Sequence, residues 1–136
     1  MAEKTFILEI VSPERITFKK SVASVTVPGS EGSIGILADH APIMAELVIG
    51  EIRIRDVDGN VTRLATSGGF MEVSQNTVRI LADTAERKED IDLARAEEAK
   101  RRAEERLLSQ RIDIDRARAE AALKRAIIRL RVARGE

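Results

Sequence analysis

The chain has 136 residues, of which 43% are hydrophobic and 34% charged, with 23 basic side chains balanced by 23 acidic ones. This apolar content is sufficient for a packed core, whereas the balanced charge and the absence of Trp and Tyr argue against a nucleic-acid-binding protein. No Cys is present and no apolar run approaches the roughly 18 residues of a membrane-spanning helix, so disulfides and direct membrane insertion are not expected.

Short runs of alternating polar and apolar residues, separated by turn signals, fill the chain up to about residue 82. Their regular succession predicts an antiparallel β-sandwich or flattened barrel, with Pro28-Gly29 ending the third run and Gly50 the fifth. The run 43–49 is apolar enough to predict burial on both faces. The strands are expected at residues 5–11, 15–19, 23–27, 32–37, 43–49, 51–57, 61–66, 70–73 and 77–81.

The remaining stretch is dominated by the helix formers Ala, Glu, Arg, Lys and Leu, with no Gly or Pro before Gly135. We therefore expect an α+β protein with a β-sandwich over residues 1–85 and a helical hairpin over residues 86–136. The first helix is predicted from about residue 89 to 109, and the second begins after an N-cap at Asp113 or Asp115.

Small side chains dominate the predicted contact between the two helices, which predicts an antiparallel hairpin that opens at modest cost. The connection at residues 108–111 lacks Gly, so one long continuous helix is the alternative. The apolar stripes are Leu93, Ala96, Ala99, Ala103 and Leu107 in the first helix, and Ala119, Ala122, Leu123, Ala126, Leu130 and Ala133, flanked by Ile127, in the second.

Three motifs in fixed order identify a family resemblance: GILADHAP at 35–42, SGGFMEV at 67–73 and ILADTAER at 80–87. The chain resembles the epsilon subunits of bacterial F-type ATP synthases. The resemblance implies a rotor subunit whose sandwich binds the gamma subunit and the c-ring, coupling proton flow to ATP synthesis. It also implies a tail that extends into the alpha/beta catalytic head and inhibits ATP hydrolysis. The expected location is peripheral, at the cytoplasmic face of the bacterial cell membrane.

Some members of this family bind ATP on the compact hairpin, through Ile or Leu, Asp, two variable residues, Arg and Ala. The resemblance therefore implies ATP as a regulatory ligand, with no required cofactor and the role of Mg²⁺ left open. The alternative for Asp92 and Arg95 is a surface ion pair worth about 0.2–0.5 kcal/mol. Arg125 and Arg129 share one helix face, as a pair of phosphate-binding guanidinium groups would. The residues at nucleotide-contacting positions are Glu86, Ile91, Asp92, Arg95, Ala96, Arg125 and Arg129.

From the residues alone, His40 is expected to be a satisfied histidine of its turn. The resemblance also places this turn and the loop Glu31-Gly32-Ser33 near the rotor contacts. Gly68 and Gly69 are expected to serve backbone geometry, because they lack the Lys and the spacing of a phosphate-binding loop. The basic end of the chain is either a solvated face or a docking surface for an acidic segment of the catalytic head. Its members are Lys124, Arg125, Arg129, Arg131 and Arg134.

Catalysis by this chain is not expected, because one His and no Cys leave no nucleophile–base pair to assemble. Two alternative functions remain: an ATP-sensing regulatory module, and a non-catalytic adaptor with a helical arm. The adaptor is disfavoured because the apolar stripe is not sustained over the three to four heptads that a stable coiled coil needs.

Overall fold

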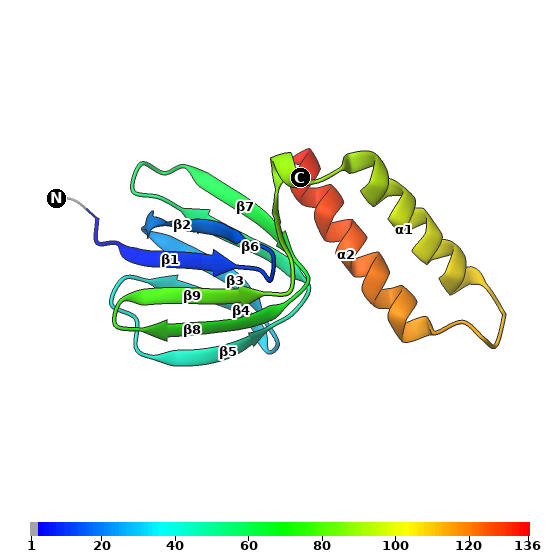
Figure 1. The fold of residues 1–136 in the computed structure, drawn as a ribbon, viewed down its shortest axis with the longest axis horizontal. Coiled ribbons are helices and arrows are strands. Elements are labelled where there is room, and N and C mark those ends of the chain that lie inside the picture. Colours follow the sequence, from blue (N-terminus) through cyan, green and yellow to red (C-terminus); the bar gives the residue numbers. More distant parts are fainter. Residues whose placement is uncertain (1–2) are drawn as a thin grey trace.

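A computed structural model describes residues 3–136, in which a β-sandwich is followed by a short 3-10 turn and two helices (Figure 1). The predicted α+β class, a sandwich followed by a helical hairpin, is confirmed. The strands are β1 (Phe6–Val11), β2 (Ile16–Val22), β3 (Ser24–Gly29), β4 (Gly32–Leu37), β5 (Ile43–Leu47), β6 (Gly50–Arg55), β7 (Val61–Thr66), β8 (Gly69–Ser74), β9 (Thr77–Ala82) and β10 (Ala85–Arg87).

The strands are linked in the order β10-β7-β6-β3-β5-β8-β9-β1-β2, with β4 paired to β3 outside this path. All pairs are antiparallel except β1 with β9, which run parallel from Ile7 opposite Thr77 to Val11 opposite Leu81. This one parallel pair was not predicted. Its strands are distant in sequence, so no hairpin turn fixes their relative direction.

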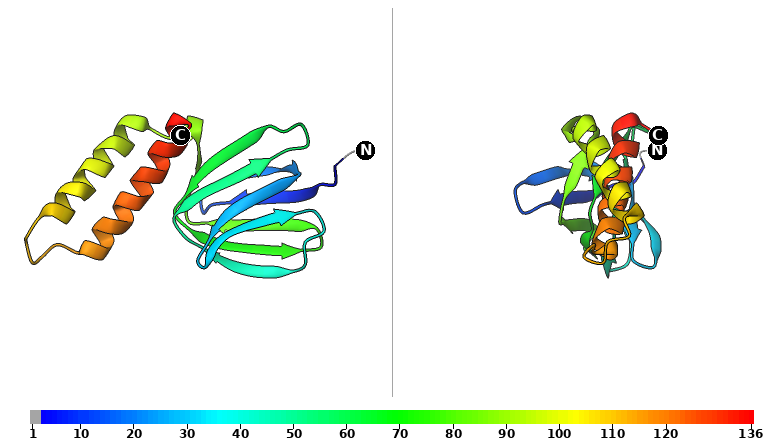
Figure 2. Two further views of the ribbon diagram at one scale, coloured as in Figure 1. Left: turned by 180° about the vertical axis from the view of Figure 1, so that it is seen from behind. Right: turned by 90° about the vertical axis from the view of Figure 1, so that its right-hand side faces the viewer.

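Alternation places one face of each strand in the core between the two layers, as with Phe6, Leu8 and Ile10 of β1, each at most 2% exposed. The predicted burial of residues 43–49 on both faces is wrong, because Met44 on β5 is 76% exposed. The helices pack at one end of the sandwich and leave this outer face uncovered (Figure 2).

Two predicted strand ends are also wrong. β3 continues through Pro28 to Gly29, because Gly29 pairs with Gly32 across the β3–β4 turn. Gly50 opens β6 instead of ending a strand, and it pairs with Thr66 of β7.

The first helix, α1, spans Leu93–Leu108 and begins later than predicted. Residues Lys88–Asp90 form the 3-10 turn η1, and Asp92 is the N-cap of α1. The acidic residues before Asp92 therefore lie in the linker, ahead of the helix. They do not form the first turn of the helix.

The second helix, α2, spans Arg116–Arg134, with Asp115 as its N-cap and Gly135 as a left-handed C-cap at φ 71°. The alternative of one continuous helix is not observed. Arg116 donates to the carbonyl oxygens of Leu107 at 2.8 Å and Ser109 at 2.9 Å, which satisfies the end of α1 and favours the break.

The helices form an antiparallel hairpin in which α2 lies between α1 and the end of the sandwich, against β6, β7 and β10 (Figures 1 and 2). The predicted stripes are largely confirmed, except that Leu93 and Ile127 are exposed and Val132, which was not predicted, is buried. The buried residues of the two helices are Ala96, Ala103, Ala119, Ala126, Leu130 and Val132.

Candidate functional site

A cavity of about 690 Å³ lies where the end of the sandwich, the linker and both helices meet. Its volume falls within the range of small-molecule sites, about 300–1,000 Å³. The lining residues are Ser12, Pro13, Glu14 and Arg15 of the β1–β2 turn, Asp83, Thr84, Ala85, Glu86, Asp90, Ile91 and Asp92 around β10 and the linker, Arg95, Ala96, Ala99 and Arg102 of α1, and Arg129 of α2.

The segment from Ile91 to Ala96 builds the beginning of α1 against this cavity. The Asp92 carboxylate accepts a hydrogen bond from the backbone N–H of Arg95, Oδ1 to N at 3.1 Å, which is N-cap geometry. No ion pair joins the Asp92 and Arg95 side chains within residues 3–136, so the surface ion pair weighed above is not formed. Arg95 lines the cavity and is exposed.

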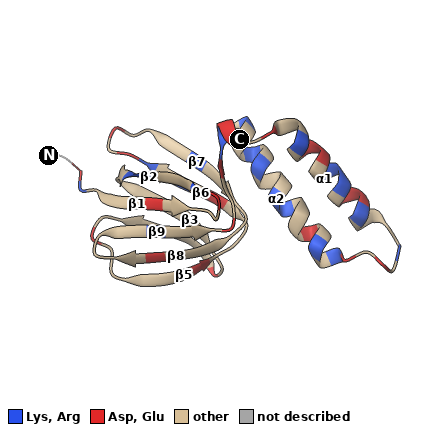
Figure 3. Cartoon of the chain, in the orientation of Figure 1, with Lys and Arg blue, Asp and Glu red and all other residues tan. Residues whose placement is uncertain are grey.

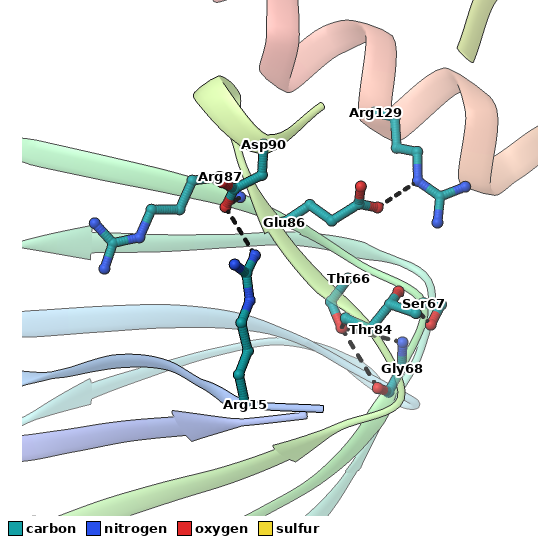
Figure 4. Close-up of polar contacts among 9 residues, drawn as sticks. All are labelled: Arg15, Thr66, Ser67, Gly68, Thr84, Glu86, Arg87, Asp90 and Arg129. Carbon is teal, nitrogen blue, oxygen red and sulfur yellow. Dashed lines mark hydrogen bonds and ion pairs between the residues drawn. The ribbon is translucent and has the colours of Figure 1, made fainter. Parts of the chain in front are cut away.

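Glu86 and Arg129 join β10 to α2 across one side of the cavity. Arg129 Nε donates to Glu86 Oε1 at 2.6 Å, and the two side chains are 29% and 28% exposed respectively (Figure 4). This charge-assisted hydrogen bond links α2 to the last strand of the sandwich. Both residues were predicted as nucleotide contacts, and both line the cavity.

The β9–β10 connection is held by a network of hydroxyl groups below this ion pair (Figure 4). Thr66 Oγ1 donates to the Thr84 carbonyl oxygen at 2.8 Å and accepts from the Gly68 N–H at 3.2 Å. Thr84 Oγ1 donates to Ser67 Oγ at 2.7 Å. Glu86 therefore projects from a rigid segment of the sandwich.

The backbone geometry of the 67–73 motif makes this network possible. Gly68 and Gly69 have φ values of 116° and 146°, and a Cβ at Gly69 would lie 2.1 Å from the Leu81 carbonyl oxygen. Their predicted role in backbone geometry is confirmed.

The linker is anchored to the sandwich on its other side by Arg87 and Asp90. Arg87 donates through Nη2 to the Thr17 carbonyl oxygen at 2.9 Å, and its guanidinium lies 5.2 Å from the centroid of the Phe18 ring. Asp90 Oδ2 accepts from the Arg87 N–H and from Arg15 Nη2, both at 3.3 Å (Figure 4). These contacts hold the linker against the sandwich up to residue 90.

One predicted nucleotide contact lies outside the cavity lining. Arg125 lies one turn before Arg129 and borders a second hollow beside Ser67 and Thr84, which is too small for a water molecule. Conversely, Arg102 and Arg15 line the cavity and were not predicted. Arg102 could have been found, because it follows Arg95 by two helical turns, whereas nothing local connects Arg15 to the linker.

The predicted rotor residues do not form one cluster. Glu31, Gly32 and Ser33 are exposed at the β3–β4 turn, and His40 follows the other end of β4. The strand separates them by roughly 17 Å at about 3.3 Å per residue. His40 Nδ1 donates to the Ala41 carbonyl oxygen at 2.6 Å, so its ring is held by its own turn.

The basic end of the chain is partly engaged within the compact tail, whose helices carry closely spaced Lys, Arg, Asp and Glu residues (Figure 3). Arg129 pairs with Glu86, and Arg134 Nη2 lies 2.7 Å from Glu97 Oε1 of α1. Lys124 and Arg131 are exposed. The compact arrangement therefore occupies two of the five predicted docking residues.

The outer face of strands β5, β8 and β9 carries an apolar patch that sequence reasoning missed. Met44, Phe70 and Leu81 are 76%, 58% and 55% exposed, and Phe70 lies directly opposite Leu81 in the sheet. We call these three residues the outer apolar patch. Such exposure of large apolar side chains on one face is typical of a protein-binding surface.

Neither metal binding nor a membrane span emerges from the described residues. Within residues 3–136, no three His, Asp or Glu side chains converge in a geometry that could hold a metal ion. Over the same range, neither helix has the combination of length and apolar content that a bilayer crossing demands.

Comparison with protein families agrees with this architecture along nearly the whole chain. Residues 5–88 match the family described as ATP synthase, Delta/Epsilon chain, beta-sandwich domain. Residues 89–134 match the family described as ATP synthase, Delta/Epsilon chain, long alpha-helix domain.

Individual relatives are named as the epsilon chain of ATP synthase. An ATP synthase epsilon chain of Symbiobacterium thermophilum is 53% identical over 127 residues, covering 93% of this chain and 91% of the relative. One from Syntrophomonas wolfei is 50% identical over 107 residues, covering 79% of this chain and 78% of the relative.

Solved structures extend the likeness to assembled complexes. A chain of the Euglena gracilis mitochondrial ATP synthase, in a structure of OSCP, F1 and c-ring, matches with a TM-score of 0.77 and 26% identity, over 88% of this chain and 76% of that one. A chain of the Tetrahymena thermophila mitochondrial ATP synthase central stalk and c-ring shares the fold, with a TM-score of 0.58 and 18% identity over 99% and 98% of the two chains. The chain therefore belongs to the ATP synthase delta/epsilon chain family, as a non-catalytic subunit of the bacterial epsilon type.

Proposed function

We propose that this epsilon-type subunit binds ATP on its compact tail, and that the extended tail inhibits ATP hydrolysis by the synthase. The observation that carries the proposal is the cavity between the sandwich and the tail. Six of the seven residues at predicted nucleotide-contacting positions line it, and they come from β10, the linker with α1, and α2. The six are Glu86, Ile91, Asp92, Arg95, Ala96 and Arg129.

The chemistry of the lining suits a nucleoside polyphosphate. Arg95, Arg102 and Arg129 present guanidinium groups that can fork onto phosphate oxygens. Ile91 and Ala96 supply apolar surface beside them, and a carboxylate such as Glu86 can accept a hydrogen bond from an exocyclic amino group.

The contacts that hold the tail compact are weak enough to be switched. Most of the buried helix contact is made by Ala, which contributes little at about 25 cal/mol per Å² of apolar surface. The ion pairs Glu86–Arg129 and Arg134–Glu97 remain partly exposed, and such pairs contribute about 0–1 kcal/mol each. A ligand with a differential affinity of a few kcal/mol can therefore shift the tail between two arrangements.

Opening the tail would also change the charge that it presents. When α2 leaves the sandwich, Arg129 loses Glu86, and when the hairpin opens, Arg134 loses Glu97, so both become available to other carboxylates. An acidic segment of the alpha/beta head is the partner that fits this basic end, whose other members are Lys124, Arg125 and Arg131.

The sandwich is the proposed anchor in the rotor. The outer apolar patch suits the gamma subunit, because it provides apolar area away from the tail. The turn at Glu31 is a candidate contact for the c-ring. In this arrangement the subunit couples proton flow to ATP synthesis and lies peripherally at the cytoplasmic face of the bacterial membrane.

Inhibition by the tail is tested by measuring ATP hydrolysis by the cognate complex lacking this subunit, after adding back the full chain or residues 1–89. The truncation keeps β10 paired with β7, so the sandwich retains its last strand. We expect both proteins to bind and only the full chain to inhibit. Equal hydrolysis rates at equal binding would refute the inhibitory tail and favour an ATP sensor or a purely structural arm.

ATP binding is tested by calorimetric titration of the full chain with ATP up to millimolar concentration. Saturable heat is expected, and Arg129→Ala should remove it. Arg111→Ala is the matched control, because Arg111 pairs with Asp113 in the exposed helix connection, away from the cavity. Absence of saturable heat in the unmodified chain would refute ATP binding.

A further inference from the structure

The β1–β2 turn forms a wall of the cavity that belongs to the sandwich and not to the tail. Ser12, Pro13, Glu14 and Arg15 all line the cavity. The turn is held by hydrogen bonds from Ser12 N to Arg15 O at 2.9 Å, from Arg15 N to Ser12 O at 3.3 Å, and from Ser12 Oγ to Arg15 O at 3.3 Å. The Arg15 side chain therefore starts from a fixed backbone position.

The Arg15 side chain reaches from this turn toward Asp90 of the linker (Figure 4). Its only side-chain partner within residues 3–136 is Asp90, with Nη2 to Oδ2 at 3.3 Å, a long contact for a charged pair. That same carboxylate oxygen also accepts the Arg87 N–H. The Arg15 side chain is 57% exposed, and its other guanidinium N–H groups are available to a ligand.

Three of the five carboxylates that line the cavity have structural partners, whereas Glu14 and Asp83 form no side-chain hydrogen bond or ion pair within residues 3–136. Glu86 pairs with Arg129, Asp90 binds Arg15 and Arg87, and Asp92 caps α1. By contrast, the Arg95 and Arg102 side chains make no hydrogen bond or ion pair with any residue in 3–136. An anion entering the cavity can therefore contact the unpaired guanidinium groups of α1 and, from the β1–β2 turn, that of Arg15.

We propose that Arg15 is a further ligand-binding residue, which contacts the phosphates of a nucleoside polyphosphate and so ties the sandwich to the tail. This inference rests on the ATP binding proposed above. The complete site exists only while the β1–β2 turn, the linker and both helices lie together. A ligand held on both sides stabilises that compact arrangement by mass action, without any change in the helix contacts.

The test compares Arg15→Ala with the unmodified chain in calorimetric titrations with ATP, AMP and inorganic tripolyphosphate. We expect Arg15→Ala to raise the Kd for ATP and for tripolyphosphate about tenfold, and to change the Kd for AMP about twofold or less. Arg15→Lys keeps the charge but loses the forked geometry, so its Kd for ATP should fall between those of Arg15→Ala and the unmodified chain. Arg79→Ala is the matched control, because Arg79 is similarly exposed (53%) and has an even longer contact, 3.9 Å, to Glu9 on the outer sheet face.

The outcomes separate this inference from the function on which it rests. If Arg15→Ala binds ATP like the unmodified chain while Arg129→Ala loses binding, the role of Arg15 is refuted and the ATP site stands. If the unmodified chain gives no saturable heat with ATP, the ATP site itself is refuted, and this inference falls with it. Circular dichroism melting of Arg15→Ala excludes unfolding as the cause of weaker binding.

Discussion

Arg129 of α2 and Glu86 of β10 are 43 residues apart in sequence and meet at 2.6 Å, joining the tail to the sandwich at the edge of the cavity. The carboxylate side of this pair is fixed by the Thr66–Thr84 network, and the guanidinium side travels with α2. The same two residues occupy predicted nucleotide-contacting positions. Arg129 lines the cavity while it pairs with Glu86, so docking of the tail and binding of the ligand involve the same guanidinium.

Replacing Glu86 by Gln should loosen α2 from the sandwich, because the charged acceptor of Arg129 is lost. We expect the docked arrangement to lose about 1 kcal/mol, in line with partly buried charged hydrogen bonds. Hydrogen exchange of the α2 backbone amides should then rise roughly fivefold. Asp113→Asn is the control, since it breaks an ion pair whose side chains are 72% and 65% exposed. Unchanged exchange in Glu86→Gln would show that the pair does not hold α2.

Overpacking the helix contact should open the hairpin. Ala126, in the apolar stripe of α2, is 1% exposed, so Ala126→Leu should destabilise the packing of α2 by about 1–3 kcal/mol. Ala117→Leu adds the same atoms at an exposed position of α2 and should have little effect. The chain contains no Cys, so spin labels on cysteines introduced at Glu98 and Asn60 can report the distance between α1 and the far end of the sandwich. Identical distance distributions in both variants would contradict a switchable hairpin.

Local pattern predicted most of the fold. The alternation in residues 61–66 predicted β7 to the residue, and the Asp115 cap was one of two predicted starts for α2. These features depend on backbone preferences and on one buried face, both of which are encoded within a few residues of sequence. The division of the chain at residue 85 stays a prediction.

Features that depend on distant contacts could not be predicted. The apolar residues of β5 predicted burial on both faces of the strand. Met44 is nevertheless exposed, because the tail packs at the end of the sandwich and not on this face. Within the candidate site, the lining residues at the start of α1 were predicted from their motif. Arg15 meets Asp90 across 75 positions, and no periodicity in the sequence encodes that distance.

Substituting Gly69 should destabilise the sandwich strongly. Its φ of 146° disfavours L-residues, and a Cβ there would meet the Leu81 carbonyl oxygen at 2.1 Å, so β8 and β9 would have to separate. We expect Gly69→Ala to lower the free energy of unfolding by about 2 kcal/mol or more in urea denaturation. Gly35→Ala is the control, because a Cβ at Gly35 in β4 meets nothing within 4 Å. Equal losses in the two variants would show that crowding at Gly69 is not the cause.

Introducing charge on the outer apolar patch should weaken attachment to the stalk while the fold remains intact. Phe70 is 58% exposed and lies opposite Leu81, so Phe70→Glu removes apolar area from the centre of the patch without entering the core. If the gamma subunit covers this face, burying the new carboxylate against apolar surface should raise the Kd for the complex lacking this subunit more than tenfold. Val57→Glu places the same charge at an exposed position, 51% accessible, in the β6–β7 connection, and should bind normally. Equal affinity of both variants for the complex, at unchanged melting temperature, would exclude the outer apolar patch as the anchor and leave the β3–β4 turn as the better candidate.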